Sequence, residues 1–219
     1  MDVEIWSDIA CPWCYIGKRR FEAALEQFEH RDDVNVTWRS FELDPDAPPE
    51  RTGDRAERLA QKYGMTVEQA REAEQRLTGV AAGEGLDFRF DIARSGTTFD
   101  AHRLVHLAET HDLQDAMKER LLQAYFTEGE LMSNHDTLVR MAAEVGLEED
   151  EVRELFAGER FVDEVRADER TAGELGISAV PTFVVDRKLG ASGAQPPEAL
   201  LDLLRQGWAK RSPVSELAS

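Results

Sequence analysis

The chain has 219 residues, of which 42% are hydrophobic, with 15 glycines and 8 prolines. This composition is typical of compact domains and excludes disordered, collagen-like and low-complexity architectures. The 26 basic and 44 acidic residues give a net charge of -18. Such a charge repels polyanions, so we expect no nucleic-acid partner.

The basic residues are mostly arginine, because only five of the 26 are lysine. Acidic residues occur throughout the chain. Together these features predict a salt-adapted surface, whose stability would rise as salt screens the self-repulsion. The alternative is an acidic protein of ordinary salinity that its net charge keeps soluble.

The first residues predict a strand and then a helix. Val3 and Ile5 alternate with polar residues, which is typical of a strand over 2–7. The segment 11–14, Cys-Pro-Trp-Cys, precedes apolar residues at helical spacing, and Pro12 suits the first turn of a helix. A second alternating run around 34–38 predicts another strand, which ends near the proline-rich segment 44–49.

The middle of the chain is predicted to be helical. Thr66 and Gln69 form a capping-box pattern before a helix that ends near Gly83, and an alternating segment at 86–92 interrupts the helices. Thr97 or Thr98 is placed to cap the next helix. Further helices are expected over 113–126, 135–145, 149–156 and 161–175.

The end of the chain returns to a sheet pattern. A strand over 182–185, a turn at 186–187 and a strand over 188–191 precede a helix that starts at 196–197. The whole order predicts an α/β fold, a small mixed sheet flanked by helices and divided by a helical insertion. No signal peptide or run of about 18 apolar residues is present, so we expect a cytoplasmic location and no membrane partner.

Cys11 and Cys14 are the two cysteines, and they bracket a loop too short for a disulfide to stabilise much. Their position at a helix start indicates reactivity. The free N–H groups and the dipole there favour a thiolate on Cys11 without a side-chain cation, so we expect its pKa in the broad window of about 3.5 to 7.5. Cys14, one turn deeper, would resolve a mixed disulfide formed at Cys11.

Two other uses of the cysteines compete with redox chemistry. A structural zinc site needs four ligands, and His102 with His106 are candidates for the other two. Nothing in the sequence brings these histidines to the cysteines, so no metal is expected. Two buried cysteines that serve only packing are the second alternative.

Pro181 follows Val180 where a helical stretch returns to strand. It is either an ordinary edge-strand proline or a cis proline, whose neighbouring backbone offers an N–H and a C=O to an extended peptide.

Several segments in this order resemble the DsbA-like thioredoxin superfamily, and within it the FrnE-like branch. They are Cys-Pro-Trp-Cys-Tyr-Ile-Gly-Lys-Arg at 11–19, Phe-Glu-Leu-Asp-Pro at 41–45, Ala-His-Arg-Leu at 101–104, Ala-Tyr-Phe at 124–126, Val-Pro-Thr-Phe at 180–183 and Ser-Gly-Ala-Gln at 192–195. The resemblance implies a discontinuous thioredoxin-like domain at 1–48 and 177–219. It also implies a helical insertion with a connecting helix at 49–176, overhanging the active site.

The resemblance also implies roles for single residues. Cys11 is the nucleophile, Cys14 the resolving thiol, and Pro181 a cis proline facing them. The substrate would meet Pro12, Trp13 and the backbone of Val180. His102, from a helix that comes near the site in related proteins, is a further candidate contact, and an ordinary surface or core histidine is the alternative. The N–H groups of Gly193, Ala194 and Gln195, before the last helix, are candidates to hold a substrate carboxylate.

The sequence departs from the pattern of related proteins in one place that matters for proton transfer. Thioredoxins often keep a buried acid in the strand before the motif, and here that position is Ile5. Asp8 and Glu4 lie nearby, but the pattern identifies neither as buried.

The predicted function is a dithiol-disulfide oxidoreductase or isomerase that acts on protein or low-molecular-weight disulfides and thiols. It would need no cofactor beyond the Cys11–Cys14 disulfide. Its electron donor or acceptor is unidentified, and the chain is expected to be a monomer or a weak dimer. Kappa-type glutathione transferases and chromene-carboxylate isomerases share the inserted-helix fold and remain an alternative, although they usually have serine at the active position. A non-catalytic holdase that binds unfolded clients is the other alternative.

Overall fold

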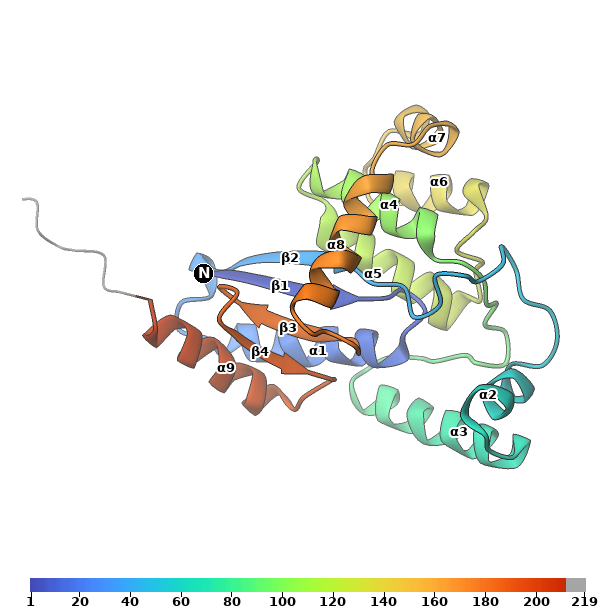
Figure 1. Ribbon diagram of the computed structural model, residues 1–219, viewed down its shortest axis with the longest axis horizontal. Coiled ribbons are helices and arrows are strands. Elements are labelled where there is room, and N and C mark those ends of the chain that lie inside the picture. The colour runs from blue at the N-terminus through green and yellow to red at the C-terminus, as the bar shows by residue number, and fades with distance from the viewer. Residues whose placement is uncertain (212–219) are drawn as a thin grey trace, which may run out of the picture.

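A four-stranded mixed sheet forms the centre of the computed structural model, which describes residues 1–211 (Figure 1). The strand order is β2-β1-β3-β4, and the bounds are β1 (Asp2–Ser7), β2 (Asn35–Ser40), β3 (Thr182–Val185) and β4 (Leu189–Ser192). β1 pairs parallel with β2 and antiparallel with β3, and β3 pairs antiparallel with β4. The predicted α/β fold class is therefore confirmed.

Helices connect and surround these strands. α1 (Pro12–Glu26) links β1 to β2, and α9 (Pro197–Ala209) follows β4. Between β2 and β3 lie α2 (Arg55–Tyr63), α3 (Val67–Gly83), α4 (Phe99–Glu109), α5 (Gln114–Gln123), a π-helical turn (Ala124–Glu128), α6 (His135–Glu144), α7 (Glu149–Ala157) and α8 (Val162–Glu174). In Figure 1, α4 to α7 lie on the β2 side of the molecule, and α2 with α3 lie beyond the start of α1.

Local sequence signals account for several element ends. The Thr66 hydroxyl accepts from the Gln69 N–H and the Gln69 side chain accepts from the Thr66 N–H, so the predicted capping box is confirmed. Thr97 accepts from the N–H of Phe99 at the start of α4. The Thr98 hydroxyl makes no capping bond, because it donates to Asp8 instead.

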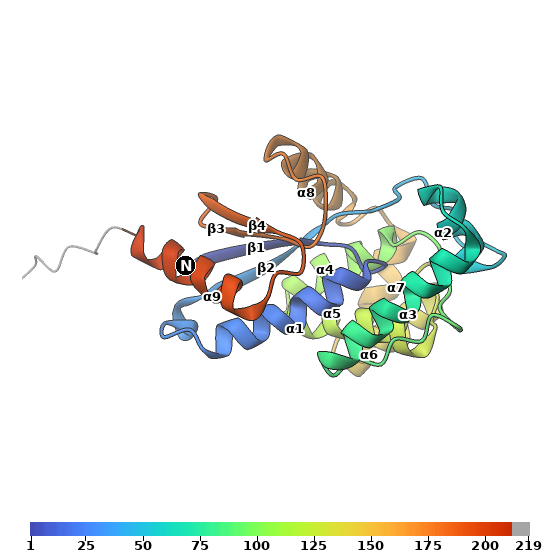
Figure 2. The ribbon, with the colours of Figure 1, turned by 90° about the horizontal axis from the view of Figure 1, so that it is seen from below.

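One face of the sheet is apolar. Val3 and Ile5 of β1 and Phe183 and Val185 of β3 are fully buried in the main hydrophobic core. α1 and α9 cover this face (Figure 2). α9 approaches closely at Gly207, where a Cβ would lie 2.4 Å from Cγ1 of Val185. A larger residue at 207 would therefore push α9 away from the sheet.

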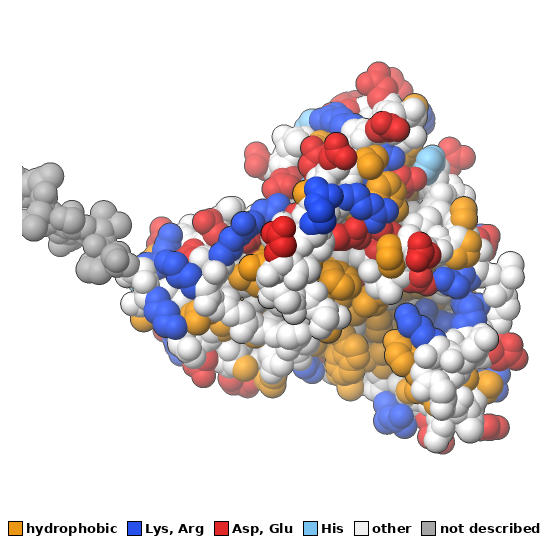
Figure 3. Space-filling view, viewed as in Figure 1, with side chains coloured by type: hydrophobic (Ala, Val, Ile, Leu, Met, Phe, Trp, Pro, Cys, Tyr) orange, Lys and Arg blue, Asp and Glu red, His pale blue; other side chains and the backbone are white. Residues whose placement is uncertain are grey.

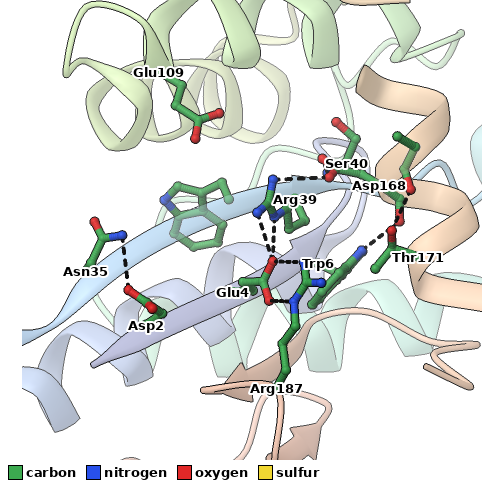
Figure 4. A network of polar contacts seen from close by, with 12 residues as sticks. Asp2, Glu4, Trp6, Asn35, Arg39, Ser40, Glu109, Asp168, Thr171 and Arg187 are labelled. Atoms are coloured by element: carbon green, nitrogen blue, oxygen red, sulfur yellow. Dashed lines mark hydrogen bonds and ion pairs between the residues drawn. The ribbon is translucent and has the colours of Figure 1, made fainter. Parts of the chain in front are cut away.

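The opposite face lies against α8 and combines polar groups with a small apolar cluster, in which Trp6 and Val184 pack with Ala172 (Figures 2 and 4). The Trp6 indole donates to the Asp168 carbonyl at 3.0 Å, and the Ser40 N–H donates to the Asp168 carboxylate at 2.9 Å. The Arg39 guanidinium lies between Glu4, at 2.9 Å, and Asp168, at 3.4 Å. Directional bonds between side chains and backbone thus hold α8 on the sheet.

Within residues 1–211, no helix combines the length and the hydrophobicity that crossing a bilayer requires.

Candidate active site

The two cysteines lie where β1 gives way to α1. Cys11 occupies the N-cap position with an extended backbone, and Pro12 is the first helical residue. Cys14 lies in the first turn, where its N–H donates to the Cys11 carbonyl at 3.0 Å. Both are free thiols; Cys11 is 4% exposed and Cys14 is completely buried. A reagent approaching from solvent therefore meets Cys11 first.

The segment before β3 faces Cys11. The peptide bond between Val180 and Pro181 is cis, the geometry that the resemblance implied. The Cys11 thiol lies 3.5 Å from the Val180 carbonyl oxygen, to which it donates. Cys11, Cys14 and Val180 belong to one small cluster of buried residues, so the fold brings together groups that are about 170 positions apart in the chain.

Gly17 makes the close approach of α1 to Pro181 possible. A Cβ at this position would lie 2.8 Å from Cγ of Pro181 and 3.4 Å from the Phe183 ring. The sequence analysis assigned no role to this glycine. Its signal is a glycine in the interior of a helical pattern, where it costs stability unless close packing requires it.

Asp8 is the buried acid that the sequence pattern did not identify. It is only 2% exposed. The Leu43 N–H and the Thr98 hydroxyl donate to its carboxylate at 2.8 and 2.9 Å. Burial opposes ionisation, but these bonds and the His102 imidazole hold the pKa of Asp8 below its ordinary value. Glu4 is buried as well, but it lies beside Arg39 and Arg187 on the sheet face under α8.

His102 does not line an open substrate site. It is 1% exposed, and its Nε2 lies 3.4 Å from the Asp8 carboxylate. Burial lowers the pKa of the imidazole. The predicted substrate contact of His102 stays a prediction, and in this structure the helix turns the side chain inward to Asp8. His106 binds Ser40 and Asp168 instead, so the two histidines do not converge on the cysteines.

Lys118 is a buried cation that the sequence analysis missed. Its side chain comes from α5, is 1% exposed, and donates to the carbonyl of Ser7 at 3.2 Å. Burial lowers the pKa of this lysine to about 8, against the opposing effect of negative charge on Cys14, Asp8 and Cys11. Its signal in the sequence is a lysine next to Met117 on the buried side of a helix.

The electrostatic environment of Cys11 differs from the expected one. The hydrogen bond with Cys14 and burial raise the pKa of Cys11 well above its ordinary value, and the Asp8 carboxylate acts in the same direction. A helix N-terminus favours the thiolate, but here it acts on a desolvated sulfur beside another sulfur. The expectation of a low Cys11 pKa is not supported in this reduced state.

Two N–H groups of the segment before α9 are used within the chain. The Gly193 N–H donates to the Pro181 carbonyl at 2.7 Å, and the Gln195 N–H donates to the Gly193 carbonyl at 2.8 Å. The Ala194 carbonyl accepts from Arg20 at 2.7 Å. The carboxylate site predicted over Gly193, Ala194 and Gln195 stays a prediction, and the bond from Gly193 ties the segment to Pro181.

Apolar side chains lie beside the dithiol. Trp13, between the two cysteines, is 45% exposed, and Leu43, whose N–H donates to Asp8, is 42% exposed, whereas Val180 is almost fully buried. Figure 3 shows hydrophobic side chains gathered near the centre of one face, between the lower end of α8 and the start of α1. Predicted contacts Pro12 and Trp13 lie at the surface of this region, so the site combines a shielded thiol pair with an apolar rim.

The model of the DSBA-like thioredoxin domain matches residues 2–205. The chain belongs to this family. The chain is 28% identical over 195 residues to YwbO of Bacillus subtilis, a match that covers 87% of the chain and 90% of YwbO.

Solved structures agree with this membership. A probable DsbA oxidoreductase from Streptomyces coelicolor is 45% identical, with a TM-score of 0.93 over 100% of this chain and 94% of that one. The cytosolic disulfide reductase DsbM of Pseudomonas aeruginosa is 20% identical, with a TM-score of 0.67 over 95% and 99% of the two chains, and shows the fold alone. The disulfide oxidoreductase class predicted from sequence is confirmed at this level, and the FrnE-like branch stays a prediction.

Proposed function

We propose that the protein exchanges disulfides with protein or small-molecule thiol substrates through a mixed disulfide on Cys11. The observation that carries this proposal is the placement of the Cys11 thiol at the start of α1, 3.5 Å from the Val180 carbonyl and next to Pro181. An extended substrate segment that pairs with the Val180 backbone would place its own sulfur beside Cys11. Pro12 and Trp13 would form the opposite side of the entrance.

The reaction proceeds in two exchanges. The Cys11 thiolate attacks one sulfur of a substrate disulfide, and a substrate thiolate leaves. The Cys14 thiolate then attacks the Cys11 sulfur, which releases the second substrate thiolate and forms the Cys11–Cys14 disulfide. The protein loses two electrons and the substrate gains them; the protons released by the two cysteines balance those taken up by the substrate thiolates. The reverse sequence oxidises a substrate dithiol.

The buried charges assist the second exchange. Cys14 is fully buried, so its thiolate forms without water around it, at a cost that a nearby cation reduces. Lys118 supplies that cation. Among the negative groups that favour the charged form of Lys118, Cys14 has the largest effect. Lys118→Met would therefore slow the release of substrate from Cys11 more than the first attack. A Lys118→Arg variant keeps the charge and is the matched comparison.

Other features of the proposal come from the sequence and the relatives. The redox group is the cysteine pair itself, and the electron donor or acceptor is unidentified. The expected cytoplasmic location is in keeping with the cytosolic disulfide reductase among the structural neighbours, whose solved forms include one with glutathione. A chromene-carboxylate isomerase shares the fold at 12% identity. This likeness is one of fold alone and identifies no isomerase residue in this chain. The holdase alternative and the monomeric or weakly dimeric state stay predictions.

The test equilibrates the protein in defined thiol-disulfide buffers and measures the redox state of Cys11 and Cys14 by alkylation and mass. A midpoint near about -120 mV, the potential of a strongly oxidising enzyme, indicates an oxidant of client thiols. A midpoint near about -270 mV, the potential of thioredoxin, indicates a reductase. The Cys14→Ser variant should trap a mixed disulfide on Cys11, whereas Cys11→Ser should trap none. Failure to form the Cys11–Cys14 disulfide in any buffer would overturn the proposal.

A further inference from the structure

A second group of charges, built around one buried carboxylate, lies beside the site and takes no part in the reaction above. Glu42 follows β2, and its side chain is 1% exposed. Arg166 and Glu169 come from α8. One nitrogen of Arg166, Nη1, donates to Oε2 of Glu42 and to Oε2 of Glu169, at 2.7 Å in each case. Two carboxylates therefore converge on a single guanidinium nitrogen.

The remaining oxygens of this cluster have no donor. Oε1 of Glu42 and Oε1 of Glu169 are both buried, and neither has a hydrogen-bond partner within residues 1–211. The Arg166 side chain also stacks over the Phe99 ring at 4.4 Å, which holds the guanidinium in place. With both carboxylates ionised, the charge of Glu42 would sit on an almost fully buried side chain that shares its one guanidinium nitrogen with a second carboxylate. Such a charge is costly for a desolvated group, and a proton is the usual neutraliser.

The cluster is connected to the dithiol through one short stretch of backbone. Leu43, the residue after Glu42, donates its N–H to Asp8, and Asp8 lies within electrostatic reach of Cys11. The charged groups that face Glu42 are Arg166 and Glu169 from α8 and Asp8 from the loop before α1. A charge that appears on Glu42 therefore adds to the negative potential that Asp8 already places on the Cys11 sulfur.

We propose that Glu42 holds a proton near neutral pH, and that its loss at higher pH disfavours the Cys11 thiolate. Burial raises the pKa of Glu42 to about 7, and the neighbouring carboxylate of Glu169 adds to the increase against the attraction of Arg166. Glu42 would act as a pH-dependent positioning charge and never touch the substrate. Its role in the reaction rests on the proposed function, but the proton and its effect on one thiol do not.

The proton is tested by NMR of protein labelled with carbon-13 at the glutamate carboxyl carbon. One glutamate resonance of the parent should titrate near pH 7, and Glu42→Gln should remove it. Glu169→Gln should move it to lower pH, because Arg166 then faces a single carboxylate. Glu164→Gln, an exposed change on the same helix, should leave it in place. A parent in which no glutamate titrates above about pH 6 would overturn the proposal.

The effect on the thiol is tested by alkylation with iodoacetamide between pH 6 and pH 9. A Cys14→Ser background leaves Cys11 as the one reactive thiol. Glu42→Gln should react roughly two- to tenfold faster than this background at pH 8, because glutamine carries no charge there. The two rates should converge at pH 6, where Glu42 keeps its proton, and Glu164→Gln should match the background throughout.

Equal alkylation rates for Glu42→Gln and the background at every pH would overturn the proposal that the charge on Glu42 disfavours the Cys11 thiolate. Glutamine has the shape of a protonated glutamate, so the variant should fold; the parent circular dichroism spectrum checks this. The assay follows the ionisation of one thiol and involves no disulfide exchange. A protein that shows the pH-dependent difference but forms no Cys11–Cys14 disulfide would contradict the proposed function alone.

Discussion

Val3 and Ile5 point from β1 into an apolar core under α1 and α9, whereas Glu4 and Trp6 point from the same strand towards α8. The first face is held by burial, which has little directional preference. The second adds ion pairs and hydrogen bonds to a small apolar cluster, and these bonds are strong only at the right distance and angle. Alternating residues of one strand thus serve two different kinds of packing.

This difference matters for the site, because α8 leads directly into the loop that carries Val180 and Pro181. The Asp168 carboxylate accepts a hydrogen bond from the Ser40 N–H and lies close to Arg39 and His106. These contacts fix the position and rotation of α8 on the sheet. The apolar face supplies most of the stability, and the polar face determines where the loop meets Cys11. Five changes test this division.

The largest expected effect is on the apolar face. Ile5→Ala removes a fully buried side chain from the centre of the core. We expect the free energy of unfolding to fall by about 4 kcal/mol, measured by urea denaturation. Ile92→Ala, at a position that is 42% exposed, should change it by less than about 1 kcal/mol. A loss at Ile5 no larger than at Ile92 would refute the assignment of stability to this face.

The polar face comes next. Asp168→Ala leaves the Ser40 N–H without its acceptor and Arg39 without one of its two carboxylates. Because Arg39 is partly exposed, we expect a loss of about 2 kcal/mol rather than the larger cost of breaking a fully buried pair. Glu164→Gln, exposed on the same helix, is the control. The proposed role also requires Asp168→Ala to slow disulfide exchange, and an unchanged rate would separate α8 from the site.

Gly17→Ala perturbs the apolar side next to the dithiol. The new methyl group would lie 2.8 Å from Pro181, so one of the two must move. We expect a loss of about 1 to 2 kcal/mol in unfolding and roughly a tenfold slower exchange. Gly79→Ala in α3, where nothing lies within 4 Å of the new Cβ, should instead stabilise the protein slightly. An active Gly17→Ala variant would show that the contact is not needed.

Acid separates the two faces, since the apolar contacts carry no charge. The hydrogen bond from Arg187, helped by Arg39, holds the pKa of Glu4 below its ordinary value of 4.5. The unfolded chain therefore binds a proton before the folded chain does, so this pair stabilises the fold above about pH 4.5 and loses its effect as pH falls further. Arg187→Gln should flatten the decline of unfolding free energy below pH 4.5, with Ile5→Ala keeping the parent slope.

Salt gives the smallest effect. The net charge of -18 repels itself, and screening weakens that repulsion. We expect the thermal midpoint to rise between low and molar KCl, by a few degrees. Ile5→Ala should show a parallel rise from a lower starting value, because burial is not screened. A flat or falling midpoint would contradict the salt-adapted interpretation of the surface.

The sequence by itself determined the order of the strands and of most helices and the location of the dithiol, whereas α2 (Arg55–Tyr63) was not predicted. Strand alternation, the capping box at Thr66 and the proline at position 12 act between near neighbours in the chain, so their pattern is visible without the fold. The motif Cys-Pro-Trp-Cys and the Val180–Pro181 step were recognised together only because their resemblance to a known family supplied the distant partner.

Only the tertiary structure decided what surrounds that dithiol. Asp8, His102 and Lys118 are residue types that usually lie at the surface. Here α4 turns His102 inward, α5 turns Lys118 inward, and all three side chains are removed from water. The N–H groups of Gly193 and Gln195, predicted to face a ligand, donate to the carbonyls of Pro181 and Gly193. Burial and hydrogen-bond satisfaction depend on which elements meet, and a pattern along one chain does not contain that information.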